Sequence, residues 1–467
     1  MVFSSLTFLC FFMPLCILFY LLWKNRVYRN IVLLIFSMLF YSWGEPSYII
    51  LMLAATLIAY LGGLLVASSA GRKKKAAFVA TLVLLTANLA IFKYANFFVD
   101  TINLLPFVDI SIKEIALPIG ISFYTFQILS YVIDLYRGEI SLQKNPFYLL
   151  LYVSFFPQLI AGPIVRYKTI EGEITQRTET TEDFAAGLRR FILGLGKKVI
   201  LANGVAKVAT IIYASAGTDG AVYYGTLAYW VAALAYTMQI YFDFSGYSDM
   251  AIGLGRIFGF HFLENFNYPY IARSVTEFWR RWHISLSQWF RDYIYIPLGG
   301  NRVSKPRWIL NILLVWGLTG LWHGSNWNFV LWGLYFALLL VIEKLFLGRL
   351  LEKLPGIVGW VYTFIIVNVS WVIFNLVDFP QMLNALRMMF VYSPTYIDAA
   401  ISENSSIITA LFYLPIAFLV SFPIVPWLKK LLNPPEFVQN IFYLALFLLC
   451  LVYVISSTFN PFIYFRF

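Results

Sequence analysis

The sequence predicts an all-α integral membrane protein with many spans. Of its 467 residues, 61% are hydrophobic and 12% are charged, whereas a soluble domain is about 45–50% apolar and about 25% charged. Apolar runs of about 20 residues, the length needed to cross the hydrocarbon core, recur along the chain. The period-2 alternation of a membrane β-barrel is absent. No linker rich in Pro, Gly or Ser divides the sequence and no internal repeat stands out, so we expect one membrane domain over residues 1–467.

Twelve apolar segments are expected to give about eleven or twelve membrane helices, some of them re-entrant. The first is followed by Lys24 and Arg26 rather than preceded by positive charge, and no cleavage pattern of small residues follows it. We therefore expect a retained helix and not a signal peptide. The segments cover residues 3–23, 30–44, 47–68, 76–98, 117–136, 148–165, 222–243, 308–323, 327–347, 357–377, 406–425 and 437–458.

Loop cations predict the orientation of these spans, because cytoplasmic loops are enriched in Lys and Arg. Basic residues gather at 24–29 and 72–75, and Lys429 and Lys430 precede the last segment. Placing these loops in the cytoplasm puts the amino terminus on the extracytoplasmic side. The same preference, with anionic lipid headgroups, accounts for the net charge of +11. We therefore expect membrane lipid, and no nucleic acid, as a partner.

Residues able to bind a metal are few. Cys10, Cys16 and Cys450 lie in apolar runs without metal-ligand spacing, and the sequence holds only three histidines, so we expect no metal site and no tightly bound cofactor. A phosphate-binding Gly-rich loop, His-Glu-x-x-His and Gly-x-Ser-x-Gly are all missing. These absences argue against ATP hydrolysis, zinc proteolysis and α/β-hydrolase chemistry.

The most informative segment is Trp-His-Gly-Ser-Asn-Trp at 322–327. A titratable side chain within membrane-spanning sequence is costly to bury and therefore marks a functional site, and histidine is suited to moving a proton near neutral pH. We expect His323 to be the reactive centre; a histidine that only hydrogen-bonds between helices is the alternative. If 308–323 is helical, the residues sharing its face are Trp316, Thr319, His323 and Asn326, with Gly317, Gly320 and Gly324 allowing a neighbouring helix to approach closely.

A second cluster lies in residues 274–300, which the pattern predicts to be one helix. Ser274 and Glu277 fit a capping box, and Pro297 begins a closing Pro-Leu-Gly-Gly. Residues at spacings of three and four form an aromatic face and a cationic stripe. Guanidinium groups bind phosphate oxygens in pairs, so the stripe suits a phosphate-bearing ligand such as coenzyme A; lipid headgroups are the alternative. The face is Phe278, Trp282, Leu286, Trp289 and Tyr293, and the stripe is Arg280, His283, Ser287 and Arg291.

Other charged residues fall near apolar sequence. Asp243 and Asp249 at the end of a span are costly unless paired, so we expect them to neutralise nearby arginines or to orient an imidazole. Lys93 is expected to snorkel to the membrane surface. Residues 167–220 have the pattern of an amphipathic helix in the cytoplasmic interface, with the basic residues Arg189, Arg190, Lys197 and Lys198.

Six stretches together resemble the membrane-bound O-acyltransferase family, and most closely its bacterial polysaccharide O-acetyltransferase branch. The likeness covers most of the chain in order, although residues 381–405 match nothing useful. The stretches are PIGISFYTFQILSYVIDLYRG (118–138), FFPQLIAGPIVR (155–166), YFDFSGYSDMAIGLGRIFGF (241–260), FWRRWHISLSQWFRDYIYIPLGGNR (278–302), GLWHGSNWNFVLWG (320–333) and NPFIYFRF (460–467).

The resemblance implies a ring-like bundle of about eleven tilted helices around a central tunnel, in a bacterial cytoplasmic (inner) membrane. It implies acetyl-CoA as the cytoplasmic acyl donor and an exported polysaccharide as the acceptor. This acceptor would be reached through an extracytoplasmic SGNH-hydrolase-like acetyltransferase or another acyl-carrying partner. The family's histidines fall on His323 and His283.

The likeness and the residues together give each candidate a role. We expect His323 to act as general base and His283 as orienter or oxyanion donor. Alternative acceptors are peptidoglycan, or teichoic acid with D-alanine in place of acetate. A transporter or flippase of an acylated glycan or lipid is the rival class. The expected donor or substrate contacts are Arg280, Arg281, Arg291, Ser287, Asn326, Trp316, Trp322, Asp243 and Asp249.

Overall fold

The computed structural model describes residues 1–216, 224–396, 406–456 and 463, and all regular elements in this part of the chain are helices. The predicted all-α class is therefore confirmed. The chain divides into two compact units: unit 1 is 1–191 with 248–263, and unit 2 is 192–247 with 264–467. Two helices contribute residues to both, α9 (Thr181–Gly196) and α11 (Thr226–Ile257). The prediction of a single membrane domain stays a prediction.

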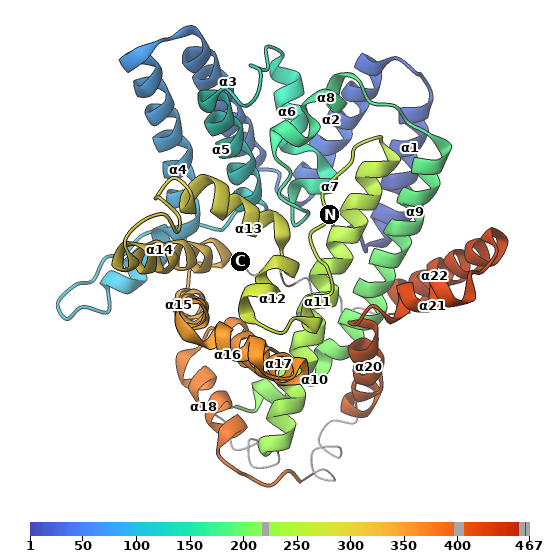
Figure 1. Cartoon of the computed structure of the whole chain (residues 1–467). Helices are drawn as coiled ribbons and strands as arrows, with labels where there is room; N and C mark the ends of the chain where they lie inside the picture. The colour runs from blue at the N-terminus through green and yellow to red at the C-terminus, as the bar shows by residue number, and fades with distance from the viewer. Residues whose placement is uncertain (217–223, 397–405, 457–462, 464–467) are drawn as a thin grey trace. The chain divides into compact units, whose positions relative to one another are not determined.

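Unit 1 holds the amino-terminal helices. Helices α3, α4 and α5 lie side by side (Figure 1), and a Cβ at Gly62 of α3 would overlap the side chain of Thr81 on α4, so a small residue is needed at this contact. The elements that lie wholly in unit 1 are η1 (Phe8–Phe12), α1 (Met13–Leu21), α2 (Arg26–Gly44), α3 (Ile49–Ser68), α4 (Gly71–Ile102), α5 (Ile121–Arg137), α6 (Pro146–Ser154), α7 (Phe156–Leu159) and α8 (Tyr167–Thr175).

Lys93 corrects one expectation. It does not snorkel: its side chain is buried in unit 1, where its Nζ donates to Ser122 Oγ at 2.8 Å. The Ser122 hydroxyl supplies one of the polar contacts that a buried amine requires.

Unit 2 holds both motif histidines and the remaining elements. They are η2 (Lys197–Ala202), α10 (Asn203–Ala214), η4 (Pro269–Ile271), α12 (Val275–Arg281), α13 (Ile284–Phe290), η5 (Arg291–Tyr295), α14 (Lys305–His323), α15 (Trp327–Ile342), η6 (Glu343–Leu347), α16 (Gly348–Lys353), α17 (Gly356–Asn375), α18 (Phe379–Phe390), α20 (Ser406–Val420), α21 (Ile424–Leu432) and α22 (Glu436–Ser456).

Six described helices are long and apolar enough to cross a membrane, and a seventh span arises if the pair 407–420 and 424–432, bent by 67°, counts as one. The protein is therefore a multi-span membrane protein. Other expected segments are shorter or broken; residues 148–165, for example, divide into α6, α7 and a loop. The ring-like arrangement and the tunnel stay predictions. The six helices are Arg26–Gly44, Ile49–Ser68, Gly71–Ile102, Trp327–Lys353, Gly356–Asn375 and Glu436–Ser456.

The core of unit 2 is aromatic where it surrounds the motif histidines. Trp279 of α12 packs edge-on to Trp332 of α15, with ring centroids 5.6 Å apart, and Trp332 stacks on Trp371 of α17 at 5.9 Å. Large rings bury much apolar area with few rotamers. This core therefore holds α12, α15 and α17 in fixed relative positions beside the site.

Candidate active site

His323 is the last residue of α14, which packs tightly against α15. A Cβ at Gly320 would overlap the carbonyl oxygen of Phe329, and one at Gly324 would overlap the Phe329 ring. The expected close approach is confirmed at these two glycines. At Gly317 it is wrong, because no atom lies within 4 Å of a Cβ placed there. Gly317 therefore has no neighbouring residue that requires a glycine there.

The His323 imidazole is enclosed by aromatic rings and only 4% exposed. Its centroid lies 4.9 Å from that of Trp322, 5.0 Å from Trp332 and 5.3 Å from Phe374, all nearly perpendicular to it. The sequence placed this residue among aromatics by adjacency alone. The structure adds Trp332 and Phe374 from α15 and α17, which adjacency could not reveal.

His283 stands at a break in the predicted helix 274–300. Ser274 Oγ accepts from the Glu277 N–H at 3.0 Å, so the predicted amino-terminal cap is confirmed. The helix nevertheless ends at Arg281, and a second begins at Ile284. His283, between them, has φ +44°, a left-handed conformation that interrupts helical periodicity. The expected single helix with one continuous cationic stripe is therefore wrong.

The break brings the two imidazoles to the same indole. The His283 ring is fully buried, 4.6 Å from the Phe244 ring and 5.8 Å from that of Trp322. His283 lies outside the helices that are long and apolar enough to cross a membrane. Burial and the nearby His323 hold the pKa of His283 well below its usual range, so its ring is neutral at physiological pH. Its Nδ1 lies 3.1 Å from Oδ1 of Asn265.

A cavity of about 280 Å³ opens in unit 2 beside this cluster. Three exposed cations line it, Arg280 of α12, Arg291 of η5 and Lys344 of η6, and none of its described lining residues is acidic. Ser287 and Trp316 also line it. Four of the predicted contacts, Arg280, Ser287, Arg291 and Trp316, are thus brought together, although the stripe that suggested three of them is not one helix.

Some lining residues of the cavity are close to the two histidines along the chain. Thr319 lines it one helical turn before His323 on α14, and Leu286 and Ser287 line it one turn after His283. One turn advances about 5.4 Å. Neither imidazole is itself a lining residue.

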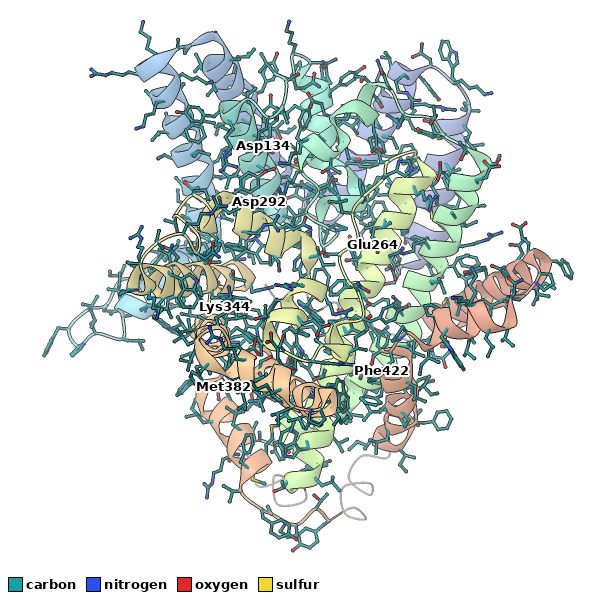
Figure 2. The ribbon with its side chains drawn as sticks, viewed as in Figure 1. Asp134, Glu264, Asp292, Lys344, Met382 and Phe422 are labelled. Carbon is teal, nitrogen blue, oxygen red and sulfur yellow. The ribbon has the colours of Figure 1, made fainter. Side chains whose placement is uncertain are left out.

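A buried carboxylate fixes the cationic side of the cavity. Glu343 accepts hydrogen bonds from Val275 N at 2.6 Å and from Thr276 N and Oγ1, each at 2.9 Å, and so satisfies the first turn of α12. This contact ties α12 to the segment that carries Lys344. Lys344 and Asp292 are labelled in Figure 2; Asp292 accepts from Arg291 Nε at 2.7 Å and offsets part of its charge.

Several predicted contacts do not line the cavity. Arg281 donates to Glu277 at 2.9 Å and to the Asn267 carbonyl at 3.1 Å. Trp322 contacts the imidazoles instead. Asn326 does not share a helical face with His323, because α14 ends at His323 and Asn326 is the extended residue before α15.

Both aspartates form ion pairs, but only Asp249 has the arginine partner that was expected, whereas Asp243 pairs with a lysine. In unit 2, Asp243 lies 2.7 Å from Lys198, and its Oδ2 accepts from Ile463 N at 2.9 Å. In unit 1, Asp249 lies 2.6 Å from Arg190. Lys198 is buried, so its placement in the membrane interface was wrong: a carboxylate on α11 draws its ammonium inward. Ile463 apart, the motif at 460–467 lies outside the described residues.

Two site residues were missed by the sequence reasoning. Lys344 ends an apolar run, and a cation at that place, in a chain with so few charges, was the available signal. Asn265 lies 18 residues before His283 in an irregular segment, so neither periodicity nor adjacency indicated it.

Fold and site together define a polytopic, all-helical membrane protein in which two buried histidines share an aromatic enclosure beside a cationic cavity. The sequence model of the membrane-bound O-acyltransferase family matches residues 89–379. The chain belongs to this family, and it is an acyltransferase.

Curated relatives extend the match beyond the family segment. The chain is 45% identical to the probable alginate O-acetylase AlgI of Azotobacter vinelandii over 385 residues, 80% of this chain and 75% of the relative. It is 32% identical to the peptidoglycan O-acetyltransferase of Helicobacter pylori over 424 residues, 83% and 80% of the two chains. Identity to the teichoic acid D-alanyltransferase of Bacillus subtilis is 32% over 240 residues, 49% and 59% of the two chains.

Proposed function

We propose that the protein transfers an acetyl group from cytoplasmic acetyl-CoA to hydroxyl groups of an exported cell-surface polysaccharide. The observation that carries this proposal is the cationic cavity whose lining includes residues one helical turn from His323 and one from His283 along the chain. The likeness to alginate O-acetylases over 80% of the chain supports the same activity.

The cavity suits the phosphate-bearing end of the donor. Arg280 and Arg291 offer planar guanidinium forks, which bind phosphate oxygens in pairs, and Lys344 adds a third positive charge. Trp279 and Trp316, also in the lining, offer apolar surface to the donor's uncharged arm. In this proposal the thioester end of the donor points along α14 toward His323.

His323 acts as the general base. The acceptor hydroxyl oxygen attacks the thioester carbonyl carbon while its proton passes to the imidazole, and the developing negative charge falls on the carbonyl oxygen. Collapse of this intermediate breaks the C–S bond, and the proton on His323 passes to the departing thiolate. General base assistance contributes typically about 10²–10⁴-fold. His283 supports the step as orienter or oxyanion donor.

The acceptor is the less constrained part of the proposal. Alginate-type relatives are 45% identical where the peptidoglycan relative is 32%, so an exported polysaccharide is proposed ahead of peptidoglycan or teichoic acid. The hydroxyl that attacks belongs to the polysaccharide or to an extracytoplasmic SGNH-hydrolase-like partner that passes the acetyl group on. The proposed location is the bacterial cytoplasmic membrane, with the amino terminus outside.

The test is thioester consumption by purified protein, paired with mass spectrometry of the envelope glycans of a deletion strain. Wild-type protein is expected to release free CoA from acetyl-CoA when an acceptor is present, and His323→Gln to do so at least 10²-fold more slowly while remaining folded in membranes. Unchanged CoA release by His323→Gln would show that His323 is not the general base. Full acetylation of the envelope glycans in the deletion strain would contradict the proposed function.

A further inference from the structure

We propose that Asn265 is a positioning residue that fixes which nitrogen of the His283 imidazole carries the proton. The position of this proton decides which of the two supporting roles His283 can take. Its effect on rate rests on the proposed function, whereas the protonation site of the ring can be measured without any reaction.

The hydrogen bonds to the Asn265 amide oxygen determine the tautomer. Oδ1 lies 3.2 Å from Ser285 N, 2.9 Å from Ser285 Oγ and 3.1 Å from His283 Nδ1. The Ser285 N–H can only donate, so the amide atom that faces it is the oxygen and not the nitrogen. An amide oxygen only accepts, so His283 Nδ1 must carry the hydrogen. In the neutral ring Nε2 then has a lone pair and no proton.

The same short segment also holds the backbone of His283. The Asn265 carbonyl accepts from Ile284 N at 3.0 Å, and Asn267 N donates to the Arg281 carbonyl at 2.9 Å. These two hydrogen bonds join residues 265–267 to the residues on either side of the break between α12 and α13. A non-glycine residue at φ +44° persists only where its surroundings determine it. Asn265 is 1% exposed, so solvent does not compete for its oxygen.

The opposite edge of the ring leaves Nε2 without a hydrogen-bond partner in the described part of the chain. Phe244 of α11 and Trp322 of α14 contact the ring, and His323 is the titratable group that acts on it. Nε2 is buried and has no hydrogen-bond partner among the described residues, although buried polar atoms are normally paired. A lone pair there can accept a hydrogen bond from an N–H or second O–H group of a bound substrate, whereas the single hydrogen of the attacking hydroxyl passes to His323. Nε2 cannot donate to an oxyanion, so His283 is the orienter.

The tautomer can be read directly by ¹⁵N NMR, because the chain has only three histidines. His261→Gln and His323→Gln variants of the full-length, histidine-labelled protein assign the signals. We expect His283 to show a protonated Nδ1 and an unprotonated Nε2 near neutral pH, and Asn265→Leu to show a mixture of tautomers. A wild-type ring protonated at Nε2 would overturn the proposal, whatever the protein's activity.

Kinetics supply the second readout. Asn265→Leu is expected to lower kcat by about 10–100-fold, the usual range for loss of a partner that orients an imidazole, with the KM for acetyl-CoA changed by less than about twofold. Asn267→Leu is the matched control: its side chain is exposed and the contacts described above are made by its backbone, so kcat should stay unchanged.

Asn265→Asp is the second variant, for use if Asn265→Leu fails to fold. A carboxylate still accepts from Nδ1, so the tautomer and most of kcat should be retained at high pH. Its charge favours the imidazolium, so the acidic limb of the pH–kcat profile should move to higher pH. A profile identical to wild type in Asn265→Asp, or wild-type kcat in folded Asn265→Leu, would make Asn265 merely structural.

Discussion

Lys198 Nζ lies 2.7 Å from Asp243 Oδ1, and both side chains are buried in unit 2. Removing one partner of a buried pair leaves the other charge uncompensated and costs about 3–5 kcal/mol. We expect Asp243→Asn to lower the free energy of unfolding by about that amount, measured by denaturant titration in detergent. Asparagine still accepts from Ile463 N, so the loss reports on charge. The double variant Lys198→Met/Asp243→Asn should recover part of it; a fully additive loss would contradict the pairing.

Arg280 and Arg281 are adjacent in sequence but differ in position. Arg280 lines the cavity, whereas Arg281 bonds to Glu277. A charge-assisted hydrogen bond contributes about 1.5–3 kcal/mol, so Arg280→Gln should weaken acetyl-CoA binding by roughly 10–100-fold. Arg281→Gln is the control and should change it by less than about threefold. Isothermal titration with acetyl-CoA measures the affinity of both variants. Equal effects of the two substitutions would argue against the cavity as the acetyl-CoA site.

Gly320 and Gly317 offer a matched pair for the contact between α14 and α15. A methyl group at Gly320 overlaps the Phe329 carbonyl, so Gly320→Ala should destabilise the protein by about 1–3 kcal/mol. At Gly317 nothing lies within 4 Å, so Gly317→Ala should stabilise α14 by up to about 1 kcal/mol through helix propensity. Thermal unfolding of both variants tests the expected opposite signs, and a loss of equal size in both would argue against the close contact.

The neutral state of His283 predicts a dependence of stability on pH. Burial, with the nearby His323, lowers its pKa in the folded protein below the unfolded value of about 6.5. As the pH falls, the unfolded chain therefore takes up this proton first. The contribution to stability is complete above about pH 6.5 and is lost progressively below it.

Replacing the histidine isolates this effect. We expect the difference in Tm between pH 7.5 and pH 5.5 to be smaller in His283→Gln than in wild type, because one acid-sensitive group is gone. His261→Gln removes an exposed histidine of unit 1 and should not reduce that difference. A difference in Tm that is unaltered by His283→Gln would show that His283 does not stay neutral in the fold.

Sequence alone determined the membrane class and the capped start at Ser274, and it singled out His323 as a candidate residue. Composition and the length of apolar runs follow from the hydrocarbon that a membrane helix must face. A helix cap depends on local hydrogen bonds. A rare titratable residue in apolar sequence is visible without coordinates. Family likeness located His283 as well. These properties depend on residues that are close together in the chain.

Tertiary structure alone decided how the site is assembled. The break at His283 is imposed by Asn265 and Asn267, 16 to 18 residues earlier, and overrides a helical pattern that continues through it. Lys344 reaches the cavity because Glu343 caps α12, and Lys198 turns inward because Asp243 lies beside it. Each is a contact between residues distant in sequence, and periodicity carries no information about which distant group will satisfy a buried charge or hydrogen bond.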